Sequence, residues 1–131
     1  LKLTKKNLIN SAAHITGGGF VENIPRILPP GVKVDVDASL WELPPVFEWL
    51  RTAGNITPIE MAKTFNCGIG MAVIVPADKA EQAKKIFEKN GEVAYYIGTV
   101  SSKAGDEPST TVNGCAGSWG YPGPWTAKST Q

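Results

Sequence analysis

The sequence predicts an α+β fold, an α/β sandwich in which helices pack on a sheet of about four strands. Two observations lead to this class. The spacing of apolar residues changes repeatedly between two and about 3.6 along residues 11–100, as expected where strands and amphipathic helices alternate. Clusters of glycine and proline separate these segments. The expected order is β-α-β-α-α-β-α-β, and no internal repeat is visible.

The first predicted unit is a strand, a glycine turn and a short helix. Residues 11–16 are a short apolar stretch that runs into three glycines, and residues 20–28 carry apolar side chains at helical spacing. Pro25 has no backbone N–H group to donate. The helix must therefore begin close to Pro25, with Asn23 as a possible N-cap, or bend there.

A second strand and a longer helix follow. Val32, Val34 and Val36 alternate with charged residues, which is the period of a strand with one buried face. Residues 43–54 carry prolines at their start and a glycine at their end, the usual start and stop signals of a helix. We expect this helix to pack on the sheet.

A capping box predicts where the next helix begins. Thr57 and Glu60 fit the N-cap and the third helical position of such a box. Residues 68–76 are almost continuously apolar and predict a buried strand, and residues 78–90 predict a third helix that stops at an Asn-Gly pair. Residues 93–100 supply the last predicted strand.

The composition changes after Val100. Residues 101–131 are rich in Gly, Ser, Thr and Pro and show neither hydrophobic period, so we expect an extended or disordered tail. As an alternative, Trp119, Tyr121 and Trp125 could form a peptide-like docking segment.

Composition and charge exclude several classes of function. Hydrophobic residues make up 42% and charged residues 19% of the 131 residues, as in one globular domain. The formal net charge of +1 offers no strong field for nucleic acid or anionic lipid. No apolar run approaches the roughly 18 residues of a membrane span, so we expect a soluble, cytoplasmic protein. Cys67 and Cys115 are expected to be free thiols.

The sharpest candidate site is the glycine loop, residues 14–26. Three glycines between a strand and a helix let the backbone approach a ligand, because no Cβ blocks it and positive φ is accessible. Amides of such a loop, together with the positive end of the following helix, can bind a phosphate. The pattern matches neither the dinucleotide fingerprint nor the Walker loop. A tight strand-to-helix turn without a ligand is an equal alternative.

Three side chains in the glycine loop are candidates for chemistry. His14 could donate to a phosphate or assist a proton transfer, or it could simply bond a backbone carbonyl. Asn23 and Arg26 would share one face if the helix continues through Pro25. Arg26 could hold a phosphate, or form a salt bridge with Glu22.

A second glycine-containing loop, residues 64–70, precedes the apolar strand. Asn66 offers an amide, and Gly68 opens the backbone. Cys67 is expected to pack in the core, because no nearby group in the sequence would clearly activate its thiol. One histidine and two distant cysteines cannot build a zinc site, so no metal ligands are expected.

Three strings carry a resemblance to a known family: AHITGGGFVENIPRILP (13–29), VFEWLRTAGNI (46–56) and EMAKTFNCGIGMAVIVP (60–76). In this order and spacing they resemble the C-terminal domain of aminoimidazole ribonucleotide synthetase, also called phosphoribosylformylglycinamidine cyclo-ligase. The resemblance spans about residues 10–100. It implies that residues 1–100 are a partial C-terminal domain, while residues 101–131 look like a non-family extension. Since the chain opens at Leu1, we expect it to be part of a longer product.

The resemblance also implies a reaction, for which the two loops supply the candidate site residues. ATP activates the amide oxygen of formylglycinamidine ribonucleotide, and the amidine nitrogen closes the imidazole ring, releasing ADP and phosphate. Mg²⁺ accompanies the nucleotide, mainly through an N-terminal domain that this chain lacks, and family members are usually homodimers. His14 is the expected catalytic residue. The expected substrate- or phosphate-binding residues are Thr16, Gly17, Gly18, Gly19, Asn23, Arg26, Asn66 and Gly68.

Two other interpretations remain open at this point. The chain could derive from another ATP-dependent member of the same superfamily, such as selenophosphate synthetase. It could also be a non-catalytic module that binds an anion through the glycine loop or a protein partner through its Trp-bearing end. In the preferred interpretation, the isolated chain has no cyclo-ligase activity.

Overall fold

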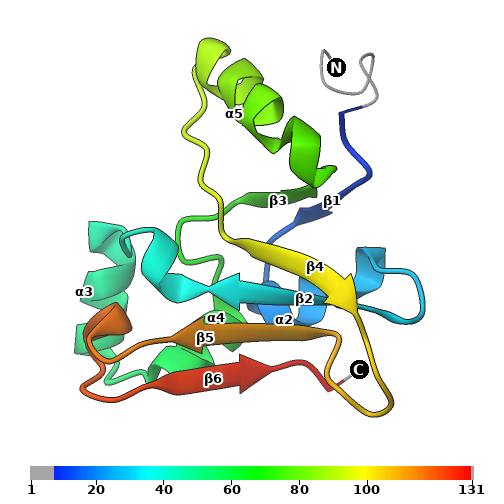
Figure 1. Cartoon of the computed structure of the whole chain (residues 1–131). Helices are drawn as coiled ribbons and strands as arrows, with labels where there is room; N and C mark the ends of the chain where they lie inside the picture. The colour runs from blue at the N-terminus through cyan, green and yellow to red at the C-terminus, as the bar shows by residue number, and fades with distance from the viewer. Residues whose placement is uncertain (1–7, 131) are drawn as a thin grey trace.

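The computed structural model describes residues 8–130, and its α+β architecture confirms the predicted class (Figure 1). The elements in chain order are β1 (Ser11–His14), α2 (Gly19–Asn23), β2 (Val32–Asp37), α3 (Pro45–Ala53), α4 (Pro58–Thr64), β3 (Met71–Ile74), α5 (Ala80–Lys89), β4 (Gly98–Ser102), β5 (Thr110–Gly114) and β6 (Trp125–Lys128). Single 3-10 turns lie at Pro25–Ile27, Ala38–Leu40, Ala77–Lys79 and Ser118–Gly120.

The strands are divided between two sheets. β1 and β3 form a small antiparallel pair, whereas the larger sheet has the order β4-β2-β5-β6. In the larger sheet β2 pairs antiparallel with β4 and parallel with β5. Figure 1 shows the small sheet between α5 and the larger sheet. The expected single sheet is thus replaced by two, because β2 finds its neighbours in segments that follow residue 97.

The larger sheet buries one face and exposes the other, as the alternation in β2 predicts. Val34 and Val36 are 8% and 1% exposed and belong to the main core. Helices α2 and α4 cover this face, with α2 against β5 and α4 against β6. Burial of valines and aromatic rings under these helices is the main source of stability for such a sheet.

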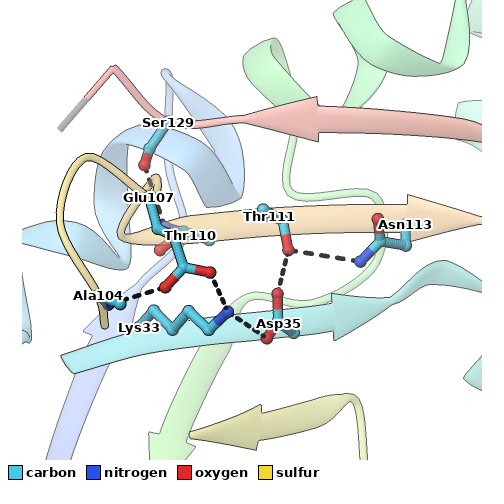
Figure 2. A network of polar contacts seen from close by, with 8 residues as sticks. All are labelled: Lys33, Asp35, Ala104, Glu107, Thr110, Thr111, Asn113 and Ser129. Carbon is cyan, nitrogen blue, oxygen red and sulfur yellow. Dashed lines mark hydrogen bonds and ion pairs between the residues drawn. The ribbon is translucent and has the colours of Figure 1, made fainter. Parts of the chain in front are cut away.

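The opposite face of the larger sheet carries a polar network (Figure 2). Lys33 Nζ lies 3.0 Å from Glu107 Oε1, and Thr111 Oγ1 donates to Asp35. The pKa of the Glu107 carboxyl is lowered, first by the hydrogen bond from the Ala104 amide and then by the one from Lys33. These contacts tie the loop between β4 and β5 to β2, which makes this face a solvated structural surface.

Local signals place the helix boundaries. The Thr57 hydroxyl accepts a hydrogen bond from the Glu60 amide at 3.3 Å, which confirms the predicted N-cap of α4. Helix α2 ends at Asn23, and the chain continues as a 3-10 turn that starts at Pro25. The bend alternative at Pro25 is therefore the one found, because Pro25 cannot donate to an α-helical carbonyl.

The prediction of an extended or disordered tail is wrong for residues 101–130, because this segment supplies β5 and β6 of the larger sheet. β5 lies between β2 and β6, and the turn before β6 seats Trp119 in the core, where it is 5% exposed; Trp125 is 6% exposed. The docking-segment alternative is wrong for these two rings as well. Strands of four or five residues among glycines and prolines bury too few side chains to show a clear period.

The predicted strand at 93–100 is only partly present. β4 begins at Gly98, while residues 93–97 have no regular secondary structure. Val93, Tyr95 and Tyr96 are all exposed. Their β-branched and aromatic side chains favour strands, but this preference depends on packing against a neighbouring strand. In the described part of the chain, residues 93–97 have no partner strand.

A row of aromatic rings links the glycine loop to the C-terminal strands. Phe20 and Trp41 have ring centroids 5.8 Å apart, Trp41 and Trp119 5.9 Å, and Trp119 and Trp125 5.0 Å. Such contacts combine large apolar burial with favourable edge-to-face geometry. The position of α2 therefore depends on residues that follow Val100. Between residues 8 and 130, no helix has the length and apolarity to cross a bilayer.

Candidate functional site

The two glycine-containing loops lie side by side at one end of the small sheet. His14 pairs with Met71 in the β1–β3 ladder, and the Ile15 amide donates to the Gly70 carbonyl at 2.9 Å. The chain leaves β1 into residues 16–19 at the place where residues 66–70 enter β3. The structure thus brings together two motifs that are far apart in the sequence.

Two of the three loop glycines are required by the backbone. Gly18 and Gly19 have φ of 95° and 59°, the left-handed region that L side chains rarely adopt. A Cβ on Gly19 would lie 2.1 Å from the Ala62 carbonyl oxygen, so α2 and α4 can approach each other only because this residue is glycine. A Cβ on Gly17 would meet nothing within 4 Å. The fold therefore gives no steric reason for a glycine at position 17, and a ligand can approach the backbone there.

The glycine loop keeps part of its amide groups available. The Gly19 amide donates to the Thr16 carbonyl at 3.0 Å. Within residues 8–130, the Gly17 and Gly18 amides have no acceptor. Helix α2 has five residues, so its dipole contributes less than a full helix would. The groups of this loop that are able to donate to an anion are therefore the individual Gly17 and Gly18 amides.

Arg26 and Glu22 form an exposed ion pair next to the loop. Arg26 Nη2 lies 3.6 Å from Glu22 Oε2, so the salt-bridge alternative for Arg26 is the arrangement found. The same carboxylate faces Gly18, since a Cβ there would lie 1.9 Å from Glu22 Oε2. A negative charge at this position opposes an approaching phosphate, and the nearby guanidinium offsets it. Because α2 ends before Pro25, Arg26 and Asn23 do not share a helical face.

Asn23 lies beneath the loop with 6% of its surface exposed. Its Nδ2 group donates to the carbonyls of Gly19 at 2.7 Å and Gly17 at 3.3 Å. Its Oδ1 accepts a hydrogen bond from Thr16 Oγ1 at 3.2 Å. Thr16 itself is exposed. The polar groups of Asn23 thus face the loop backbone from the core side.

The second loop is fixed by an Asx turn and by residues from the 41–44 segment. Asn66 Oδ1 accepts from the Gly68 amide at 2.9 Å, and Gly68 has φ of 94°. Trp41 Nε1 donates to the Cys67 carbonyl at 3.0 Å, and a Cβ on Gly68 would lie 2.5 Å from Pro44. Nothing in the local sequence signals that Trp41 and Pro44 support this loop.

His14 is exposed at the end of β1. In the described part of the chain its ring has no hydrogen-bond partner, so the carbonyl-bonded alternative is not what the structure shows. The ring lies on the solvent side of the small sheet, across from Met71. Among residues 8–130 no group of three His, Cys, Asp or Glu side chains could hold a metal ion.

Cys67 packs in the core, as predicted, and both cysteines are free. Burial raises the pKa of the Cys67 thiol from 9.0 to about 12. A thiol in this state is a poor nucleophile, because the reactive species is the thiolate. Cys67 therefore shapes the second loop without taking part in covalent chemistry.

We expect an alkylating reagent at pH 8 to modify Cys115, which is exposed, and to leave Cys67 intact until the chain unfolds. Because the folded-state pKa of Cys67 lies above its unfolded value, the stabilisation from its burial is complete below pH 9 and is lost as the pH rises towards 12. Mass spectrometry after alkylation with and without urea checks this. Equal modification of both thiols in the native chain would contradict it.

Comparison with known proteins shows the family to which this chain belongs. Residues 1–109 match the family model described as AIR synthase related protein, C-terminal domain. A protein of Neisseria meningitidis named phosphoribosylformylglycinamidine cyclo-ligase is 46% identical over 112 residues, which cover 86% of this chain and 33% of the relative. One of the same name from Nitrosospira multiformis is 46% identical over 110 residues, covering 84% and 31%. The chain spans about a third of the length of these curated relatives.

Proposed function

The chain belongs to the family of AIR synthase related proteins through their C-terminal domain, and from this premise we propose that it is part of a phosphoribosylformylglycinamidine cyclo-ligase of purine biosynthesis. The 46% identity to proteins of that name across most of the chain is the observation that carries the proposal. Both glycine-containing loops of the site fall within the matched residues 1–109.

In the proposed reaction, ATP transfers a phosphoryl group to the amide oxygen of formylglycinamidine ribonucleotide. The amidine nitrogen then attacks the activated carbon, the ring closes, and the oxygen leaves with phosphate. Catalysis of such a step depends mainly on positioning and on the stabilisation of negative charge. We propose that ATP and Mg²⁺ are held mainly by parts of the enzyme outside this chain, and that the whole enzyme is a cytoplasmic homodimer.

This chain contributes the two adjacent loops. The Gly17 and Gly18 amides supply donors to a phosphate oxygen, and Gly19 lets α2 lie close to α4. Asn66 and Gly68 lie in the adjoining loop, and His14 is exposed at the end of β1, where its imidazole can transfer a proton. Arg26 can exchange Glu22 for a ligand phosphate, since its guanidinium is exposed.

A chimeric enzyme tests the proposal. All 131 residues of this chain, including β5 and β6, replace the matching third of the Neisseria meningitidis relative, and the conversion of formylglycinamidine ribonucleotide with ATP is measured. We expect the chimera to turn over substrate and the isolated chain to show no turnover, because one third of the protein holds only part of the site. A parallel chimera with His14→Ala tests the proton-transfer role and is expected to lose at least about tenfold in kcat.

Two outcomes would contradict the proposal. A chimera that folds cooperatively and binds ATP, yet converts no substrate, would show that these loops do not serve the reaction. Turnover by the isolated 131-residue chain at the rate of the relative would show that the remaining two thirds are not needed.

A further inference from the structure

The side chain of Asn23 uses its donors entirely within the protein. Both hydrogens of its Nδ2 group are engaged, by the Gly19 carbonyl at 2.7 Å and the Gly17 carbonyl at 3.3 Å. With 6% of the residue exposed, no donor of Asn23 is left to face a ligand. We therefore do not expect the Asn23 side chain to donate a hydrogen bond to the substrate.

The hydrogen bond from Asn23 to the Gly17 carbonyl determines where the next amide points. The peptide that joins Gly17 and Gly18 is planar and trans, so its C=O and N–H groups point in opposite directions. Since the carbonyl is turned towards the core, the Gly18 amide is turned away from it. This accounts for the lack of an acceptor for that amide within residues 8–130.

We propose that Asn23 is a positioning residue, which aims the Gly18 amide at the phosphate of the ligand by holding the Gly17 and Gly19 carbonyls. This inference rests on the proposed function of the loop and deepens it. Thr16 Oγ1 fixes the amide plane of Asn23 by donating to Oδ1 at 3.2 Å. Thr16 therefore acts in the same chain of contacts, although its own side chain is exposed.

The test uses the 131-residue chain labelled with ¹⁵N and titrated with inorganic phosphate, while the amide resonances of Gly17 and Gly18 are followed. We expect both resonances to shift in the unmodified chain. Asn23→Ala is expected to weaken the phosphate affinity about tenfold, and Thr16→Val about threefold. The matched control Thr16→Ser keeps the hydroxyl and is expected to retain the affinity of the unmodified chain.

Unfolding by urea is measured on each variant, because a purely structural role would lower the unfolding free energy and leave the phosphate affinity of the folded chain unchanged. Asn23→Ala and Thr16→Val chains that bind phosphate as the unmodified chain does would overturn the inference. If Asn23→Ala does not fold, the comparison of Thr16→Val with Thr16→Ser decides, since that residue is exposed. A lack of response in the unmodified chain would instead refute the phosphate site itself, and the inference with it.

Discussion

Truncation after residue 109 is expected to abolish the cooperative unfolding transition of this chain. The cut removes β5, which lies between β2 and β6, and it removes the buried rings of Trp119 and Trp125. Loss of one buried aromatic side chain typically lowers the unfolding free energy by about 3–5 kcal/mol, and a whole domain has only about 5–15 kcal/mol. Circular dichroism during urea titration measures the transition.

Tyr121→Ala in the full chain is the matched control for this truncation. Tyr121 lies in the same segment but is 43% exposed, so its removal is expected to change the unfolding free energy by less than about 1 kcal/mol. A truncated chain that unfolds with the midpoint of the full chain would show that residues 110–131 are dispensable. That result would support the expectation of a tail beginning after Val100.

Gly19→Ala is expected to lower the unfolding free energy by about 3 kcal/mol or more, from two additive causes. The residue has φ of 59°, which disfavours any L side chain, and its Cβ would lie 2.1 Å from the Ala62 carbonyl oxygen. The backbone of α4 cannot rotate away as a flexible side chain could, so α2 must move off α4. The urea midpoint of the variant measures the loss.

Gly17→Ala is the control for the Gly19 substitution, because it adds the same methyl group in the same loop. Its Cβ meets nothing within 4 Å, and its φ lies outside the left-handed region. We expect the midpoint of this variant to match that of the unmodified chain. Equal destabilisation by the two substitutions would contradict the close approach of α2 and α4.

Most elements up to residue 92 follow from local sequence. The alternating valines place β2, the Thr57 capping box starts α4, and Pro25 ends α2 within two residues. Each of these signals acts over a few positions, either through side-chain periodicity or through one missing or added hydrogen bond. Such signals do not depend on what the rest of the chain does.

The C-terminal segment lacked such signals. β5 and β6 are five and four residues long, and each buries only two side chains. Their identity as strands comes from pairing, of β5 with β2 and of β6 with β5. Residues 93–97 show the reverse case, in which strand-forming side chains remain without a partner strand in the described chain.

The sequence by itself determined the two glycine-containing loops, the family resemblance and the burial of Cys67, because these depend on residue type and immediate neighbours. Only the tertiary structure decided that the loops adjoin, that Trp41 and Pro44 support the second loop, and that Asn23 turns towards the core. Strand pairing such as that of β1 with β3 closes a long stretch of chain. The free energy of this pairing comes from burial and hydrogen bonds between segments far apart in the sequence, so it cannot be inferred from a local pattern.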